Sequence, residues 1–335
     1  MTQKITLQDS IRARARIAGR IRQTALVPSP ALSAASGGAV SLKLESTQIT
    51  GSFKLRGATN AVLSLTEEQR AAGVVGVSTG NHGRGLAYAA AQAGVRCVIC
   101  MSELVPQNKV EGIKSHGAEV RIIGRSQDEA QAEVDRLVAE GMTMLPPFDH
   151  ADIIAGQGTV ALEMLEQMPD LETVLVPLSG GGLISGVGMV LKAANPDIRV
   201  IGVSMERGAA MHECLKAGKP VQVDELPTLA DSLGGGIGLE NAYTFEMTKS
   251  FVDEVVLVSE AEIAAAIRHA YFEEREVIEG SGSVGIAALL AGKIENPGRC
   301  AVLVSGQNID MGLHKRIIDG EDVDVAAETT GGTDA

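Results

Sequence analysis

The sequence predicts an α/β fold in which parallel sheets are covered by helices on both faces. Short, nearly continuous aliphatic runs alternate along the chain with longer stretches whose apolar residues have helical spacing. Strands that are apolar throughout are typical of parallel sheets, because the crossover helices cover both faces. The chain has 335 residues, which is enough for two domains that share an interface.

The predicted strands are the short aliphatic runs. They are Val74–Ser78, Arg96–Met101, Val120–Ile123, Val174–Leu178, Val200–Val203 and Ala301–Ser305. One of the predicted helices carries Ala130, Val134, Leu137 and Val138 at helical spacing and ends near Gly141, where glycine suits a C-cap.

The two ends of the chain have distinct compositions. Residues 5–24 interleave arginines with Ile11, Ile17 and Ile21, which predicts a surface helix that packs by one narrow apolar face. A basic helix lying on a membrane surface is the alternative. Residues 321–335 are rich in small and acidic residues, and we expect them to form a disordered tail.

Composition narrows the class of protein. The net charge of −13 does not suit a non-specific nucleic-acid binder, which needs a basic surface. No apolar stretch is long enough to cross a bilayer, and Met1–Leu7 has no apolar signal core, so we expect a cytoplasmic protein. Cys97 and Cys100 form a CxxC inside a predicted strand. Because residues three apart in a strand point to opposite faces, we expect no zinc site there.

The first strand that ends in a candidate binding site is Val74–Val77. It is followed by Ser78, Thr79, Gly80, Asn81 and His82, and then by a predicted helix. Small residues at a helix N-terminus leave backbone N–H groups free to bind an anion. A carboxylate suits this position.

Two further strands end in candidate sites. Ser179-Gly180-Gly181-Gly182-Leu183 follows one of them, and three glycines before a helix form a nest of N–H donors for a phosphate. Neither a Walker lysine nor a GxGxxG fingerprint is present. Ser305 ends the other strand, where its hydroxyl can face a ring nitrogen without carrying a charge.

Lys54 is the candidate nucleophile. It lies just inside a predicted helix whose N-cap we expect to be Ser52. Arg56 follows, and a neighbouring cation lowers the pKa of a lysine, as an amine nucleophile requires. By itself, this position of Lys54 is also typical of an exposed lysine at the start of a helix.

A phosphate nest, a carboxylate site, a nucleophilic lysine and a neutral partner for a ring nitrogen are together what a pyridoxal phosphate (PLP) enzyme needs. From Thr6 to Arg316 the chain resembles the fold-type II PLP enzymes, in the branch of threonine/serine dehydratase, serine racemase and hydroxyaspartate ammonia-lyase. The resemblance implies two domains, each an open, mostly parallel sheet covered by helices. It predicts a large PLP-binding domain of residues 1–72 and 151–320, a small mobile domain of residues 73–150, and a homodimer.

The resemblance also implies a role for each motif residue. Lys54 holds PLP as a Schiff base and later takes the α-proton, with Phe53 beside it. Asn81 contacts the phenolic oxygen of PLP, Ser305 the pyridine nitrogen and Glu279 the ring edge. The phosphate is held by Ser179, Gly180, Gly181, Gly182 and Leu183, and the substrate carboxylate by Ser78, Thr79, Gly80, Asn81 and His82. Thr79 is also the candidate acid on the second face of the cofactor, which leaves racemisation as a minor activity at most.

Departures from the family pattern bear on the substrate. Arg84 stands where the family usually has glutamine, and Ser232 stands at a glycine position of the loop beside the substrate side chain. Both favour a substrate with a second acidic group, so the predicted reaction is removal of water and ammonia from 3-hydroxyaspartate. Glu206 is out of register and Ala210 replaces an aspartate of the family's metal site, so no metal is predicted.

Several alternatives stay open at this stage. The substrate alternatives are L-threonine or L-serine, and an intermediate of hydroxyectoine breakdown. More distant alternatives are a serine racemase and a β-replacement enzyme of the cysteine-synthase type. A non-catalytic pyridoxal carrier is the remaining alternative. The favoured class is a PLP-dependent ammonia-lyase of the EC 4.3.1 type.

Overall fold

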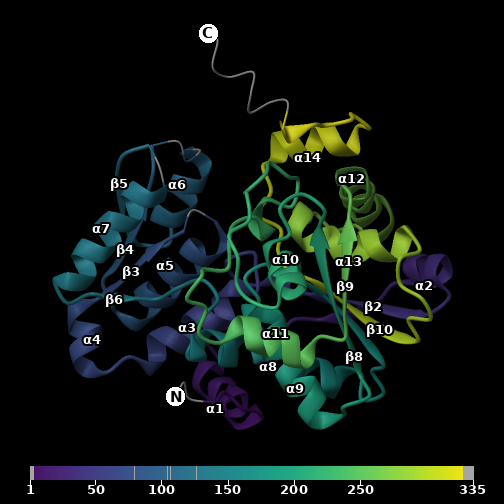
Figure 1. Ribbon diagram of the computed structural model, residues 1–335, viewed down its shortest axis with the longest axis horizontal. Coiled ribbons are helices and arrows are strands. Elements are labelled where there is room, and N and C mark those ends of the chain that lie inside the picture. Colours follow the sequence, from purple (N-terminus) through teal and green to yellow (C-terminus); the bar gives the residue numbers. More distant parts are fainter. Residues whose placement is uncertain (1–3, 79, 104, 106, 126, 327–335) are drawn as a thin grey trace.

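The computed structural model describes residues 4–78, 80–103, 105, 107–125 and 127–326. In this part of the chain the strands form two sheets (Figure 1). The larger has six strands in the order β1-β2-β10-β7-β8-β9, and the smaller has four in the order β5-β4-β3-β6. All pairs are parallel except β1 with β2. The predicted α/β class is therefore confirmed.

The strands of the larger sheet are β1 (Leu26–Pro28), β2 (Ala39–Leu44), β7 (Thr173–Pro177), β8 (Arg199–Met205), β9 (Glu254–Val258) and β10 (Arg299–Val304). Those of the smaller sheet are β3 (Val74–Val77), β4 (Cys97–Met101), β5 (Glu119–Ile122) and β6 (Thr143–Met144). The α-helices are α1 (Leu7–Ile17), α2 (Pro30–Ser36), α3 (Lys54–Ser64), α4 (Glu67–Ala72), α5 (Asn81–Ala93), α6 (Gln107–Lys114), α7 (Gln127–Ala139), α8 (Ala151–Gln167), α9 (Gly182–Ala194), α10 (Ala210–Ala217), α11 (Thr244–Phe251), α12 (Glu260–His269), α13 (Gly280–Leu290) and α14 (Met311–Ile318). Short 3₁₀ turns η1 (Glu45–Thr47) and η2 (Asp231–Leu233) and a π-helical turn η3 (Ala270–Glu274) complete the chain.

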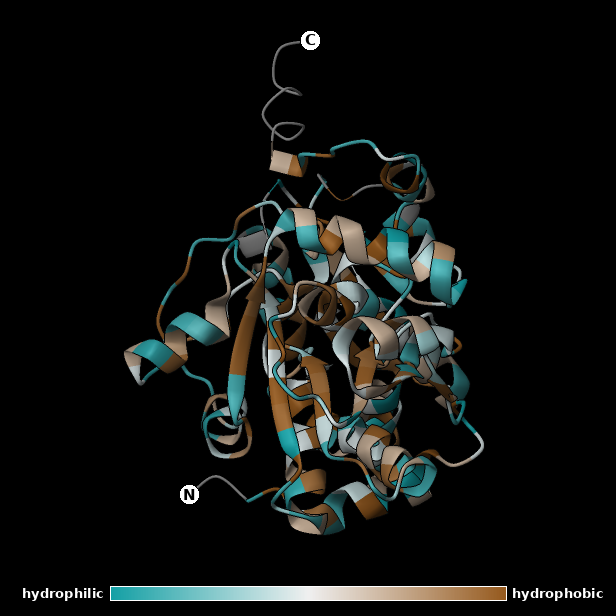
Figure 2. Ribbon diagram, turned by 90° about the vertical axis from the view of Figure 1, so that its right-hand side faces the viewer, coloured by the Kyte–Doolittle hydropathy of each residue, from teal (hydrophilic) through white to brown (hydrophobic). Residues whose placement is uncertain are grey.

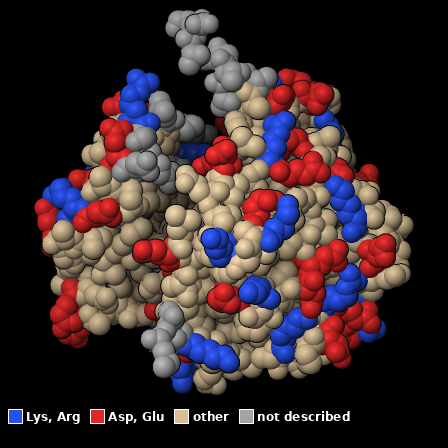
Figure 3. All heavy atoms as spheres, viewed as in Figure 1, with Lys and Arg blue, Asp and Glu red and all other residues tan. Residues whose placement is uncertain are grey.

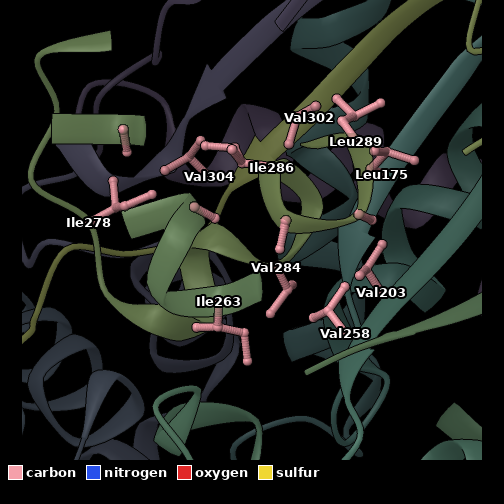
Figure 4. Packing of buried hydrophobic residues seen from close by; sticks show 14 of the residues in the cluster. Leu175, Val203, Val258, Ile263, Ile278, Val284, Ile286, Leu289, Val302 and Val304 are labelled. Atoms are coloured by element: carbon pink, nitrogen blue, oxygen red, sulfur yellow. The ribbon is translucent and has the colours of Figure 1, made fainter. Parts of the chain in front are cut away.

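Alternate residues of the larger sheet pack into different cores. Val174 and Val176 of β7 face the core that includes α8 and α9, whereas Leu175 faces the core that includes α12 and α13. Figure 4 shows Leu175, Val203 and Val302 of this second core packed around residues of α13. Both faces are thus covered, which explains why the strands are apolar throughout and why they appear brown inside a shell of mixed helices in Figure 2.

The smaller sheet follows the same rule. Cys97 faces the core with Leu86 of α5, and Cys100 faces the opposite core with Val134 of α7. The expectation that the two cysteines point to opposite faces is therefore confirmed. Both are free and buried, and burial raises the pKa of the Cys97 thiol to about 12. Across the described ranges, no three or more His, Cys, Asp or Glu side chains gather as a metal site would require.

Helix α3 lies between the two sheets, because it packs against α5 of the smaller unit and α8 of the larger one. Segments 26–44 and 173–304 supply the larger sheet, and segment 74–144 supplies the smaller. The domain boundaries and the mobility of residues 73–150 stay predictions.

The structure differs from the sequence-based expectation at several elements. Strands β1, β2, β6 and β9 were not predicted. Helix α1 packs against α8 and buries Ala13 and Ile17, whereas Ile11 is exposed. The predicted tail begins at residue 321, yet Val323 is buried against the core; residues 327–335 lie outside the described ranges. None of the described helices is long and apolar enough to cross a bilayer.

Candidate active site

One cavity between the two sheets gathers the residues that the sequence predicts around the cofactor. It encloses about 470 Å³, part of which opens to solvent. Its walls include Phe53, Lys54, Asn81, Ser179, Gly180, Gly181, Gly182, Leu183, Glu279 and Ser305. Ser232 lines it as well. These residues come from six separate stretches of sequence, so the fold brings together what the motifs only suggest.

Lys54 is the first residue of α3, and its ammonium reaches into this cavity. Its Nζ donates a hydrogen bond to the carbonyl oxygen of Pro147 at 2.8 Å and lies 5.3 Å from the ring centroid of Phe53. Burial lowers the pKa of Lys54 to about 8, and the carboxylate of Glu279 opposes this shift. The lowered pKa makes the neutral amine far more abundant near neutral pH than in an ordinary lysine, as a lysine nucleophile needs.

Two expectations about the surroundings of Lys54 are wrong. The N-cap of α3 is Phe53 in a helical conformation, and the buried Ser52 hydroxyl has no hydrogen-bond partner in the described structure. Arg56 points away from Lys54 into an ion-pair cluster with Glu45 and Glu163. The pKa of Lys54 is therefore lowered by burial and not by Arg56.

The glycine turn after β7 forms the floor of the cavity. Gly181 is the N-cap of α9 with a φ of 85°, a left-handed conformation that favours glycine. A Cβ atom on Gly180 or Gly182 would collide with Phe148. Ser179 is not among the described non-glycine residues with positive φ, so a side chain is tolerated at this first position. The N–H groups at the start of α9 would form a cradle for a phosphate, as the sequence predicts.

The start of α5 lines the mouth of the cavity, where the sequence predicts a second anion site. Gly80 is its N-cap, and Ser78, Gly80, Asn81 and His82 line an open cleft that also contains Lys54 and Ser232. Thr79, predicted both to bind substrate and to act as an acid, lies outside the described residues.

His82 is held as a neutral imidazole beside this anion site. Burial lowers its pKa to about 3, and the cation of Lys54 adds to the effect. Its Nε2 lies 2.8 Å from the carbonyl oxygen of Leu145, so this nitrogen carries the proton and donates. The contact holds the start of α5 against residues 145–147, and the carbonyl oxygen of Pro147 in this segment accepts the hydrogen bond from Lys54. A neutral His82 leaves the binding of a carboxylate to the backbone N–H groups.

Asn81, Glu279 and Asn308 form a hydrogen-bonded group beside the cavity. Asn81 Nδ2 donates to Glu279 Oε1 at 2.7 Å, Asn308 Nδ2 donates to Asn81 Oδ1 at 2.6 Å, and the Asn308 backbone N–H donates to Glu279 Oε2 at 3.1 Å. Burial raises the pKa of Glu279 to about 7, and the charge of Asp231 adds to the rise.

Ser305 closes the cavity at the end of β10. It is buried, and its hydroxyl lies 3.4 Å from the carbonyl oxygen of Ser281, to which it donates. Its own carbonyl accepts a hydrogen bond from the N–H of Phe53, which fixes the lysine loop against the strand. A hydroxyl and not a carboxylate therefore occupies this position.

Arg84 lies in a neighbouring cavity and not in the one that contains Lys54. That cavity is also lined by Lys109, Asp231, Glu279 and Asn308. Among the described residues, the half-buried guanidinium of Arg84 has no hydrogen bond or ion pair. Burial lowers its pKa and the charge of Glu279 opposes this. Ser232, in contrast, lines both the cavity that contains Lys54 and the open cleft at the mouth of that cavity.

Sequence reasoning missed three residues of the site. Pro147 supplies the carbonyl that binds Lys54, Phe148 packs against Gly180 and Gly182, and Asn308 contacts Asn81 and Glu279. The only signal for Asn308 was its place directly after the Ser305 strand end. Nothing local marked Pro147 and Phe148, since their partners lie far away in sequence.

The comparisons with known proteins agree with this geometry. The family described as pyridoxal-phosphate dependent enzyme matches residues 17–306. The chain belongs to this family. The fold is therefore the fold-type II PLP fold, as the resemblance predicted, and PLP is the cofactor.

Relatives place the chain in the expected branch. It is 59% identical to a putative threonine dehydratase of Sinorhizobium fredii, over 94% of this chain and 96% of the relative. It is 42% identical to the L-threonine ammonia-lyase of Thermotoga maritima, over 94% of this chain and 78% of the relative. The structure of maize serine racemase is similar, with a TM-score of 0.89 and 33% identity, over 94% of this chain and 97% of the racemase chain. The predicted enzyme class, a PLP-dependent ammonia-lyase, is confirmed.

The residues of the cavity fit PLP. Gly180, Gly181 and Gly182 have no side chains where a phosphate would lie, and the Lys54 amine lines the same cavity. Within the described part of the chain, the buried hydroxyl of Ser281 has no hydrogen-bond partner. Gly180, Gly181 and Gly182 would hold the phosphate, Asn81 the phenolic oxygen and Ser305 the ring nitrogen. When bound, PLP supplies an electron sink for the α-carbon of an amino acid.

Proposed function

We propose that this enzyme eliminates water from a small 3-hydroxy amino acid, with L-threonine or L-serine as its main substrate, and releases ammonia and a 2-oxo acid. The observation that carries the proposal is the neutral Ser305 hydroxyl in the cavity of Lys54. A hydroxyl does not hold a proton on a ring nitrogen as a carboxylate does, and this favours early loss of a β-leaving group over transamination.

The chain's own groups divide the work. The N–H groups at the start of α5 bind the substrate carboxylate, which orients the α-hydrogen. Lys54, whose pKa of about 8 gives an available neutral amine, takes the α-proton at its Nζ. Asn81 and the glycine turn, which both line the cavity, hold the cofactor. Full-length relatives named threonine dehydratase and L-threonine ammonia-lyase support the same substrate class.

The second candidate substrate is 3-hydroxyaspartate, and Arg84 is the observation that favours it. A half-buried guanidinium without a partner in the described chain suits a carboxylate. Lys109 lines both the cavity of Arg84 and the open cleft at the start of α5, so this cavity and this cleft adjoin. This candidate requires the distal carboxylate to reach past Asn81 towards Arg84.

The test is kcat/KM for L-threonine, L-serine and 3-hydroxyaspartate with the same holoenzyme, because specificity is a ratio of these values. We expect the highest value for L-threonine or L-serine. A higher value for 3-hydroxyaspartate, lost selectively in Arg84→Gln, would replace the main substrate by the second candidate. Absence of turnover with all three would refute the proposed reaction.

The racemase, β-replacement and carrier alternatives are separated by the products of the same assays. A racemase yields D-serine from L-serine, and a β-replacement enzyme yields cysteine from O-acetylserine and sulfide. A carrier binds PLP but turns over none of these compounds.

A further inference from the structure

Asn308 lies just outside the cofactor cavity, yet its contacts join three parts of the active site. Its Nδ2 donates to Asn81 Oδ1 at 2.6 Å and to the carbonyl oxygen of Thr50 at 2.9 Å. Its backbone N–H donates to Glu279 Oε2 at 3.1 Å. Asn81 begins α5, Thr50 precedes the lysine loop, and Glu279 is the N-cap of α13. Asn308 itself lines the neighbouring cavity and is not among the residues that line the cofactor cavity.

These contacts determine which way the Asn81 amide faces. An amide group has an acceptor oxygen at one end and two N–H donors at the other. Asn308 donates to the Asn81 oxygen, so the Asn81 nitrogen must face Glu279, whose carboxylate accepts one N–H. Because Asn81 also lines the cavity, its second N–H can donate to a bound cofactor. Rotating the Asn81 amide by 180° would place its nitrogen against the Asn308 nitrogen, a donor against a donor. It would also place its oxygen against the Glu279 carboxylate, an acceptor against an acceptor.

Asn308 also sets the position of the lysine loop. Gly51 has a φ of 75°, and a Cβ atom there would lie 2.6 Å from Asn308 Oδ1. The loop therefore packs directly against this side chain. Lys54 follows three residues later, and Ser52 forms a bridge to Gly306, two residues before Asn308. One carboxamide thus contacts both the loop that carries the nucleophile and the residue that faces the cofactor oxygen.

We propose that Asn308 is a positioning residue that orients the Asn81 amide and keeps it in register with the Lys54 loop. It acts through Asn81 and does not touch the cofactor. The same contact links α5, which packs on the smaller sheet, to the end of β10 in the larger sheet. The inference concerns cofactor binding and does not depend on which hydroxy amino acid is the substrate.

The experiment compares Asn308→Ala, Asn308→Asp and the control Gln307→Ala. Alanine removes both side-chain hydrogen bonds. Aspartate keeps the size but has no N–H, so it places an oxygen against the Asn81 oxygen. Gln307 is the exposed neighbour in the same turn, and among the described residues its hydrogen bonds are made by its backbone alone, to Gly51 and Ile309. The readouts are the Kd for PLP, the visible absorbance band of the holoenzyme, kcat and KM, and the Tm of the cofactor-free protein.

We expect both Asn308 variants to bind PLP roughly tenfold more weakly, as loss of a buried hydrogen-bond partner implies, and to shift or weaken the visible band. A fall in kcat larger than the rise in KM is expected in both, and Gln307→Ala should match the unmodified enzyme. An unchanged Kd and band in both Asn308 variants, with only a lower Tm, would show a purely structural role and overturn the proposal. If Asn308→Ala does not fold, the aspartate variant decides the question in the same way.

Discussion

At the scale of single residues, burial controls the charge of the groups around the cavity. It is the largest cause of the shifted pKa of Lys54, of His82 and of Glu279. Burial lowers the pKa of the two bases and raises the pKa of the acid, so in each case it favours the neutral form of the group. The site is thus prepared for proton transfer near neutral pH before any ligand arrives.

The first prediction concerns Lys54. Lys54→Ala should reduce elimination by about 10²–10⁴-fold, since both the nucleophile and the base are removed. After borohydride reduction, mass spectrometry should find PLP attached to the unmodified enzyme and not to this variant. Lys192→Ala is the control, because Lys192 pairs with Asp253 on the surface. Attachment that persists without Lys54 would identify a different lysine.

The second prediction uses the raised pKa of Glu279. The folded pKa of about 7 exceeds the ordinary 4.5, so the stabilisation by the protonated carboxyl is complete below pH 4.5 and is lost as pH rises to 7. As pH rises through this range, the unfolding free energy of the cofactor-free protein should fall by about 3 kcal/mol more than that of Glu279→Gln. Urea unfolding at pH 5 to 8 measures the difference. Parallel curves for the two proteins would contradict it.

At the scale of elements, both candidate anion sites are helix starts that follow parallel strands. Helix α5 follows β3 and helix α9 follows β7, so each site lies at the carboxyl edge of its sheet. The turn before α9 can approach a ligand closely because its residues have no side chains. At its left-handed residue, Gly181, a substitution would add backbone strain to the contacts that a Cβ atom would make.

The third prediction compares two glycines with positive φ. Gly181→Ala should weaken PLP binding at least tenfold, because its Cβ would meet Met211, Thr244 and Thr248 and displace the turn. Gly292→Ala is the control: its φ is 66°, but the space around it is open. Both variants should lose about 1 kcal/mol of stability from backbone strain. Equal Kd values for PLP would show that the turn does not hold the phosphate.

At the scale of the whole molecule, a buried charge cluster ties the core elements behind the lysine loop. Arg56 binds Glu45 and Glu163, and Lys43 binds Glu163, with the cations fully buried. These residues come from β2, η1, α3 and α8. The network therefore fixes α3, whose first residue is Lys54, to the larger unit. The surface is different: Figure 3 shows acidic and basic side chains interspersed on one face.

The fourth prediction tests this cluster. Arg56→Ala should lower the unfolding free energy by about 3–5 kcal/mol, because it leaves two buried carboxylates without their main partner. Arg14→Ala removes an ion pair with Glu166 that is about half exposed and should cost about 0–1 kcal/mol. Denaturant unfolding gives both values. Similar losses in the two variants would mean that the buried cluster contributes no more than a surface pair.

The sequence by itself determined the α/β class, six of the strands and the motif residues of the site. Each of these depends on local information: an aliphatic run, a helix start after a strand, or consecutive glycines. Residues 179–183 could be predicted to bind a phosphate from the sequence alone, because residues adjacent in sequence suffice to form a nest of N–H donors. The family resemblance then supplied the roles of Asn81 and Ser305.

Only the tertiary structure decided which distant residues complete the site. Lys54 meets Pro147 across 93 positions, and Asn308 meets Thr50 across 258. Arg56 turns to Glu45 and Glu163 instead of Lys54, and Arg84 faces a neighbouring cavity. These outcomes depend on how the helices pack on the two sheets. Local patterns specify which elements form, but hydrogen bonds and ion pairs between elements form only where packing brings their side chains within reach.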